Sequence, residues 1–157
     1  MIKVENLSKT FGSKRAVDDV SFEVRKGEVL GFLGPNGAGK STTMRMITSF
    51  YPPAAGKVSV CGFDVSENPI AAKEKIGYLP EAAPSYQEMT VLSFLNFAAE
   101  MRGLRGEERR KAVRRVVETC HLDCVLGQTM DTLSKGLKHR TCLAQSIFRQ
   151  PGVLGLY

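Results

Sequence analysis

Short apolar or alternating runs separated by polar turns fill the first half of the chain, and this pattern is typical of strands. Between residues 16 and 24, Val20, Phe22 and Val24 fall on one face of an extended backbone. The run 28–33 is nearly all apolar and suits a buried strand. We therefore predict five strands in this half, at residues 2–7, 16–24, 28–33, 57–61 and 76–79.

The apolar spacing becomes helical after residue 90. Thr90 would cap a helix over residues 91–101, whose apolar stripe is formed by Leu92, Leu95, Ala98 and Ala99. A second helix, from about Glu107, would bury Ala112, Val113, Val116 and Val117. Ser134 would cap a third helix, whose apolar side carries Leu137, Cys142, Leu143 and Ile147. The order of elements predicts an α/β core with a helical insertion at about residues 87–132 and a return to the core at Val153.

The net charge of +6 comes largely from residues 102–118, which hold seven basic and three acidic side chains. A solvated helix face accounts for this excess, and a docking or nucleic-acid surface is the alternative. Because no aromatic residues interleave the basic ones, we expect no nucleic-acid partner. No apolar run approaches the roughly 18 residues that cross a bilayer, and no signal peptide opens the chain, so we expect a cytoplasmic protein.

The four cysteines are expected to be reduced thiols in that compartment. Cys120, His121 and Cys124 lie close together in sequence, yet no second Cys/His pair with zinc-site spacing accompanies them. We therefore expect no metal at this segment.

Residues 34–41 read GPNGAGKS and fit the pattern G-x-x-x-x-G-K-[S/T] at every fixed position. Glycines at 34, 37 and 39 let the backbone curl so that its N–H groups form an anion cradle. Lys40 supplies a positive charge for the β- and γ-phosphates, and the Ser41 hydroxyl can ligate Mg²⁺. An apolar run before the loop and helix-forming residues 42–48 after it give the strand–loop–helix context that the pattern requires. We interpret this loop as a phosphate-binding site.

A second motif, LSKG at residues 133–136, continues to Arg140 and to Leu-Ala-Gln at 143–145. Together with the phosphate loop, at sensible spacing and in the same order, it closely resembles the ATP-binding subunit of ABC transporters. The resemblance covers essentially the whole chain, and residues 76–81, IGYLPE, are similar to the ABC-2 branch of exporters. It implies an α/β phosphate-loop nucleoside-triphosphatase (NTPase) core with an N-terminal antiparallel β subdomain and an inserted helical subdomain. The implied division of this single domain is a core at residues 1–86 and 150–157 and a helical part at residues 87–149.

The resemblance implies roles for individual residues. Phe11 matches the aromatic side chain that stacks on adenine. The phosphate- and Mg²⁺-contacting loop matches Asn36, Gly37, Ala38, Gly39, Lys40, Ser41 and Thr42. Glu81 stands where the family usually has a Gln that touches Mg²⁺ and senses the membrane subunit. Ser134 and Gly136 match the signature residues that contact the γ-phosphate held by the opposite subunit, while simple helix capping is the alternative role for Ser134.

The chain departs from the family pattern at the signature and at its end. Lys135 replaces the usual Gly, and Leu137 replaces the usual Gln. In the family, a strand after the signature helix ends in Asp-Glu, which hold the metal and activate water. Here the stretch ends in Gly155-Leu156-Tyr157, without the acidic pair, so we expect a chain that is C-terminally incomplete. Because a missing general base removes typically about 10²–10⁴-fold of rate, we expect weakened ATP binding with little or no hydrolysis.

The hypothesis is an ATP-binding subunit of an exporter that works with Mg²⁺, pairs with a second nucleotide-binding subunit and docks on a membrane permease at the inner face of the cell membrane. A non-catalytic nucleotide-binding module and an inert remnant are the alternatives. A small-molecule kinase or GTPase is disfavoured, because the sequence offers no acceptor site and no guanine-reading motif. We also expect that an unpaired apolar edge at residues 29–33 would favour aggregation.

Overall fold

A computed structural model describes residues 1–80 and 86–156 of the chain. Within these residues the chain forms two compact units, Met1–Gly77 and Tyr78–Tyr157. The division into core and helical parts that the sequence suggests stays a prediction.

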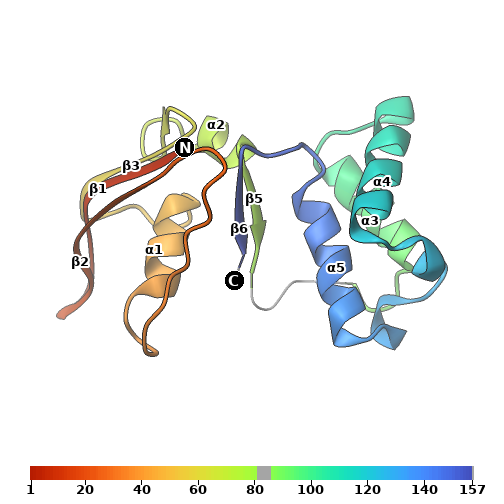
Figure 1. The fold of residues 1–157 in the computed structure, drawn as a ribbon, viewed down its shortest axis with the longest axis horizontal. Coiled ribbons are helices and arrows are strands. Elements are labelled where there is room, and N and C mark those ends of the chain that lie inside the picture. The colour runs from red at the N-terminus through yellow and green to blue at the C-terminus, as the bar shows by residue number, and fades with distance from the viewer. Residues whose placement is uncertain (81–85, 157) are drawn as a thin grey trace. The chain divides into compact units, whose positions relative to one another are not determined.

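The first unit is built on an antiparallel sheet with the strand order β2-β1-β3-β4 (Figure 1). The strands are β1 (Ile2–Phe11), β2 (Lys14–Val24), β3 (Ala55–Val60) and β4 (Phe63–Asp64). In β3 the side chains alternate, so Val58 and Val60 are buried while Lys57 is exposed. In β1 an irregularity of the pairing between Val4 and Leu7 lets both of these side chains face inward. The N-terminal antiparallel sheet that the sequence suggests is confirmed.

Two helices complete the first unit, α1 (Lys40–Ile47) and α2 (Pro69–Glu74). Met46 and Ile47 of α1 are buried, and they anchor this helix by its C-terminal turn. Pro69 begins α2, where its missing N–H removes no helical hydrogen bond.

The strand predicted at residues 28–33 is absent: the backbone there is irregular. Val29 is 98% exposed and Leu33 95%, whereas Phe32 packs edge-on against Phe22 of β2 with ring centroids 5.4 Å apart. A strand exists only where a second strand completes its hydrogen bonds, and an apolar run does not itself supply that partner. In the first unit as described, no strand pairs with this segment.

The described residues of the second unit form three helices and contribute to a two-stranded sheet. The helices are α3 (Val91–Met101), α4 (Gly106–Cys120) and α5 (Lys135–Ser146), with short 3₁₀ turns at η1 (Asp123–Val125) and η2 (Met130–Thr132). Strand β5 (Ile76–Leu79), which begins at the end of the first unit, pairs with β6 (Val153–Leu156). In Figure 1 the two arrows lie side by side and point the same way.

One continuous apolar core joins the three helices. Its largest fully buried members include Phe148, Leu95, Leu122 and Met130. The predicted apolar stripe of α4 is confirmed, because Ala112, Val113, Val116 and Val117 are all buried. The stripe predicted for α3 is wrong at one position: Leu92 is 42% exposed, and Val91 and Phe94 are buried instead. A helix this short can place a neighbouring set of residues inward by a small rotation, and tertiary packing decides that rotation.

Candidate functional site

The phosphate-loop sequence forms a tight turn that runs directly into α1. Gly34, Gly37 and Gly39 have φ angles of 150°, 85° and 86°, a region that side chains with a Cβ rarely adopt. Gly39 is the N-cap of α1, and no side-chain cap of this helix end is seen among residues 1–80 and 86–156. The first-turn N–H groups of a helix point out of its N-terminal end, so at α1 they face the side from which an anion would approach the loop.

The loop is held against strand β2. A Cβ built on Gly39 would lie 2.4 Å from the carbonyl oxygen of Ala16 and 3.2 Å from Cγ2 of Val17. Only glycine permits this approach, so the start of α1 rests on the backbone of β2. The Thr43 hydroxyl donates to the Gly39 carbonyl at 3.0 Å and secures the first helical turn.

The ammonium group of Lys40 is turned back onto the loop. Its Nζ donates to the carbonyl oxygens of Gly34 at 2.6 Å and of Pro35 at 2.8 Å. A phosphate bound in the loop would therefore meet a positive charge that the backbone already holds in place.

Phe11 lies at the end of β1, in the same unit as the loop. The β1–β2 ladder pairs Lys9 with Val17 and Phe11 with Lys14, so Phe11 is close in register to the Ala16–Gly39 contact. Its ring is 44% exposed and meets the ring of Tyr51 at 5.5 Å between centroids. The structure thus brings a partly exposed aromatic side chain and the phosphate loop onto one unit. Tyr51 is not among the residues predicted from the sequence, because the only local signal of its segment is an interruption of regular secondary structure.

The signature segment begins helix α5 in the second unit. Ser134 is extended, with φ −60° and ψ 156°, and its hydroxyl accepts from the Leu137 N–H at 3.3 Å. The predicted capping role is confirmed. Ser134 and Gly136 are both exposed, and a Cβ added at Gly136 would meet no atom within 4 Å. The fold of this chain therefore does not itself require a glycine at 136.

The remaining candidate residue, Glu81, lies outside the described residues. The last acidic residue in the sequence is Asp131, so β6 itself contains no acidic side chain. A hydrogen bond from Thr129 holds the pKa of Asp131 below its usual range. Across residues 1–80 and 86–156, no group of three or more His, Cys, Asp and Glu side chains could hold a metal ion.

The cysteines occupy different environments. Cys120 and Cys142 are buried, Cys61 is half-buried and Cys124 is exposed. Burial raises the pKa of the Cys120 and Cys142 thiols, and the charge of Arg140 partly offsets this for Cys120. Burial therefore keeps these two thiols protonated and unreactive.

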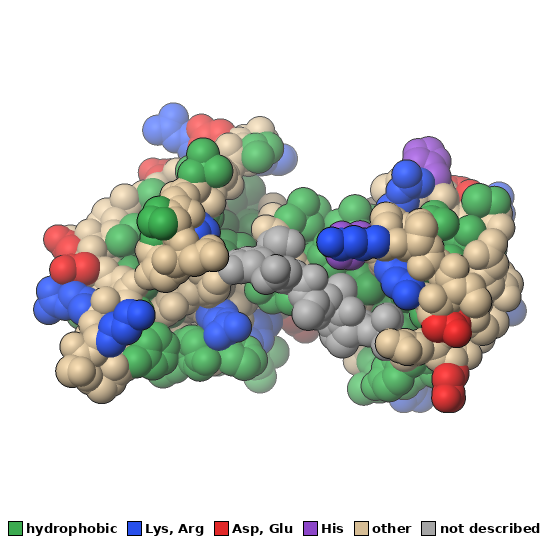
Figure 2. Space-filling view, turned by 90° about the horizontal axis from the view of Figure 1, so that it is seen from below, with side chains coloured by type: hydrophobic (Ala, Val, Ile, Leu, Met, Phe, Trp, Pro, Cys, Tyr) green, Lys and Arg blue, Asp and Glu red, His purple; other side chains and the backbone are tan. Residues whose placement is uncertain are grey.

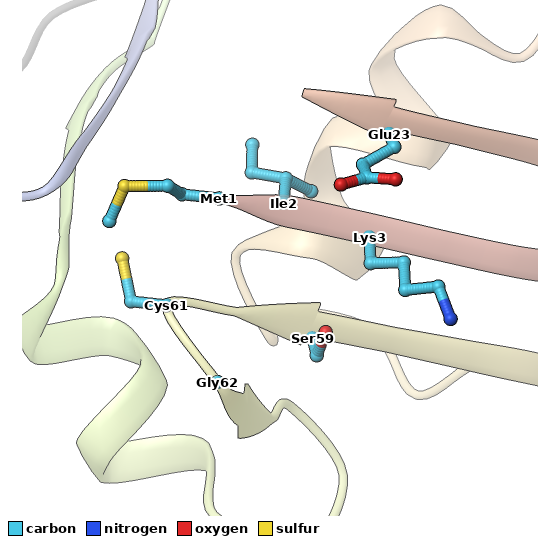
Figure 3. Close-up of a pocket in the computed structure, with 7 residues that line it drawn as sticks. All are labelled: Met1, Ile2, Lys3, Glu23, Ser59, Cys61 and Gly62. Carbon is cyan, nitrogen blue, oxygen red and sulfur yellow. The ribbon is translucent and has the colours of Figure 1, made fainter. Parts of the chain in front are cut away.

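A hollow of about 270 Å³ lies apart from the phosphate-loop residues, at the ends of β1, β2 and β3 (Figure 3). Its lining includes Lys3, Glu23 and Cys61, and the figure shows the Cys61 sulfur turned toward the thioether of Met1. None of its lining residues belongs to the phosphate loop or the signature. This hollow is therefore not part of the candidate nucleotide site.

Among known protein families, the model described as "ABC transporter" matches residues 17–156. The probable multidrug ABC transporter ATP-binding protein YbhF of Escherichia coli (strain K12) is 36% identical over 156 residues, which cover 99% of this chain and 27% of that protein. The linearmycin resistance ATP-binding protein LnrL of Bacillus subtilis (strain 168) is 36% identical, covering 98% of this chain and 50% of that protein. This chain thus spans about a quarter to a half of the length of these relatives.

A solved structure supports the same fold. The dimeric ATP-binding cassette MJ0796, bound to ADP and Pi, superimposes with a TM-score of 0.82 over 99% of this chain and 73% of that chain. Its sequence is 22% identical, so this likeness concerns the fold alone.

Proposed function

We propose, on the premise that this chain belongs to the ABC transporter family, that it holds ATP at its phosphate loop and serves an exporter. The observation that carries this proposal is the loop itself. Its glycines turn through φ values of 85° and 86° at Gly37 and Gly39, and its Lys40 ammonium already lies within the curve of the backbone. An anion cradle with a fixed positive charge is what a nucleotide phosphate chain requires.

The residues present fit the nucleotide. The backbone N–H groups at the start of α1 and the Lys40 ammonium would hold the β- and γ-phosphates, and Asn36, Ala38 and Thr42 complete the loop. Phe11, with 44% of its surface open, would stack on the adenine. The Ser41 hydroxyl would ligate Mg²⁺, which neutralises phosphate charge when bound, and Glu81 is a second candidate ligand.

The 157-residue polypeptide itself is proposed to hydrolyse ATP slowly or not at all. Hydrolysis needs a group that orients the attacking water, and no acidic residue follows Asp131 in this polypeptide. Phosphate release by the purified polypeptide at the rate of a working ABC ATPase would contradict slow hydrolysis and leave ATP binding untouched.

The signature segment is proposed to complete the ATP site of a second nucleotide-binding subunit. Ser134 and Gly136 are exposed at the N-terminus of α5, where the helix dipole favours an anion. Among the described residues, no atom within 4 Å of a Cβ built at Gly136 would exclude a side chain, whereas the close approach of a partner's phosphate would. Leu137 is half-buried against the helical core, so its apolar side chain is directed partly away from that approach.

The helical unit is proposed to dock on a membrane permease. Tyr86, Phe94, Phe97 and Met101 line a hollow of about 310 Å³ on this unit, together with Arg102 and Gln145. An aromatic-lined depression with a polar rim is a common form of a protein docking site. No helix among the described residues is long and apolar enough to cross a bilayer. We therefore propose a peripheral position at the cytoplasmic face, reached through the permease.

The charges on the helical unit fit docking on a permease better than they fit nucleic-acid binding. On α4, Arg109 pairs with Glu100, Arg110 with Glu107 at 2.5 Å and Arg114 with Glu118 at 2.9 Å. Figure 2 shows basic and acidic side chains interspersed on the face in view. Three of the five basic side chains of α4 are thus paired with carboxylates, as is common on a solvated helix face.

The test is ATP binding by calorimetry to the chain and to the variant Lys40→Gln. Because a hydrogen bond to a charged group contributes about 1.5–3 kcal/mol, the variant should bind roughly 10-fold to 100-fold more weakly. Lys26→Gln, in the exposed turn after β2, is the matched control and should bind as the wild type does. Equal affinity of Lys40→Gln and wild type would overturn the proposal.

A further inference from the structure

Three aromatic rings and two basic side chains gather in the first unit where β1 ends. The Tyr51 ring lies at its centre: its centroid is 5.5 Å from that of Phe11, at an interplanar angle of 72°, and 5.1 Å from that of Phe50, at 69°. The Lys9 ammonium lies 5.5 Å from the Phe11 centroid and 6.0 Å from that of Tyr51. The Arg45 guanidinium lies 5.8 Å from the Tyr51 centroid. Tyr51 is thus the ring that every other member of the cluster contacts.

The backbone around Tyr51 is anchored on two sides. The N–H groups of Phe50 and Tyr51 both donate to the carbonyl oxygen of Arg45, at 2.7 Å and 3.1 Å. Arg45 belongs to α1, the helix that begins at Lys40. On the other side, Lys9 of β1 donates from its Nζ to the Pro52 carbonyl at 2.6 Å. Tyr51 therefore connects the helix that leaves the phosphate loop with the strand that ends in Phe11.

The geometry points to Tyr51 as a positioning residue for the purine base: its ring holds the ring of Phe11 in the orientation that stacks on the base. This inference rests on the proposed function, in which Phe11 stacks on the adenine of ATP. A ring that is 44% exposed at the end of a strand can otherwise turn about its side-chain bonds. An edge-to-face partner restricts that motion before the ligand arrives, and such pre-organisation raises affinity.

The action of Tyr51 lies in its ring and not in its hydroxyl. Within residues 1–80 and 86–156, no hydrogen bond is seen from the Tyr51 hydroxyl, whereas its ring contacts two other rings and two cations. Phenylalanine at this position should therefore preserve the role, and leucine should remove it. Phe50 offers a matched control, because it packs on Tyr51 and makes no ring contact with Phe11 in the described part of the chain.

The experiment compares the binding of Mg²⁺-ATP and of inorganic tripolyphosphate, which lacks the base, to the full chain by calorimetry. Tyr51→Leu should weaken ATP binding by about 2-fold to 10-fold, the range that an aromatic pair contributes. It should leave tripolyphosphate binding unchanged. Tyr51→Phe and Phe50→Leu should bind both ligands as the wild type does. In a Phe11→Leu background, Tyr51→Leu should cause no further loss of ATP affinity, because its effect passes through Phe11.

Three results would overturn the inference while leaving the proposed function in place. They are an unchanged ATP affinity in Tyr51→Leu, an equal loss for ATP and tripolyphosphate, and a loss in Phe50→Leu as large as in Tyr51→Leu. Failure of the wild-type chain to bind either ligand would instead overturn the proposed function, and this inference with it. Should Tyr51→Leu not fold, Tyr51→Met, whose unbranched side chain adapts more easily to the space left by the ring, gives the same comparison.

Discussion

A Cβ on Gly39 would lie 2.4 Å from the main-chain oxygen of Ala16, well inside van der Waals contact. The closeness of the phosphate loop to β2 therefore depends on the absence of a single side chain. Since Gly39 also has φ 86°, two separate constraints require glycine at the residue that precedes Lys40.

Gly39→Ala should both destabilise the first unit and impair phosphate binding. The methyl group would force the loop away from β2, at a cost of about 1–3 kcal/mol for overpacking. We expect ATP affinity to fall by at least roughly 10-fold, because the N–H groups of the loop would no longer converge. Calorimetry with ATP and urea unfolding measure the two effects.

Gly31→Ala is the matched control for this substitution. A Cβ at Gly31 would meet no atom within 4 Å, and its φ angle is outside the left-handed region. It should bind ATP as the wild type does. If Gly39→Ala bound ATP equally well, the contact with Ala16 would have no role in shaping the loop.

Ser134 is predicted to serve two separable purposes. Ser134→Ala removes the acceptor of the Leu137 N–H and should cost about 1 kcal/mol of stability in the second unit. Ser134→Asp retains a capping oxygen and suits the helix dipole, so it should be at least as stable as the wild type. Its negative charge should nevertheless repel a partner's γ-phosphate and abolish ATP-dependent pairing with a complete nucleotide-binding subunit.

Hydrogen exchange at the first turn of α5 reports the capping effect, and analytical ultracentrifugation with and without ATP reports pairing. Pairing that is unaffected by Ser134→Asp would show that this serine acts as a helix cap alone.

The rotation of α3 can be tested with two leucines on the same helix. Leu95 is fully buried and Leu92 is 42% exposed. Leu95→Ala should cost about 2–5 kcal/mol of unfolding free energy, and Leu92→Ala should stay within about 0.5 kcal/mol. Urea denaturation of the two variants measures these changes. If both leucines faced inward, as the stripe predicted from the sequence has them, the two variants would lose comparable unfolding free energy.

Thiol chemistry should follow the burial of the four cysteines. Cys124, which is exposed, should react first with an aromatic disulfide reagent at neutral pH, followed by Cys61. Cys120 and Cys142 should react only when the second unit unfolds. Mass spectrometry of the labelled sites gives the order, and early labelling of Cys142 would contradict its burial.

The same two thiols predict a pH dependence of stability. Their pKa values are raised in the folded state, so folding favours the protonated thiol. This stabilisation is fully present below the unfolded pKa of about 8.5 and is lost as the pH rises through the folded pKa. The unfolding free energy should therefore decline above about pH 8.5. Measured relative to its value at pH 7, this decline should be smaller in Cys142→Ala than in the wild type.

Local patterns in the sequence were sufficient for features that depend on neighbouring residues. The caps Thr90 and Ser134, the buried stripe of α4 and the loop that opens α1 all follow from spacings of three or four residues. Hydrogen bonds of this kind close within one helical turn, so their partners stand next to each other in the sequence.

Contacts between distant segments were decided only by the tertiary structure. An apolar run at residues 28–33 predicts a strand, yet the ladder needs a partner that the run does not contain, and Val29 is left 98% exposed. The contact of Gly39 with Ala16 and the edge-to-face contact of Tyr51 with Phe11 likewise join residues 23 and 40 positions apart. The sequence by itself determined that this chain carries a phosphate loop and a capped signature helix. Tertiary packing decided which ring stands beside Phe11 and which strand supports the loop, because both depend on the path of the chain between them.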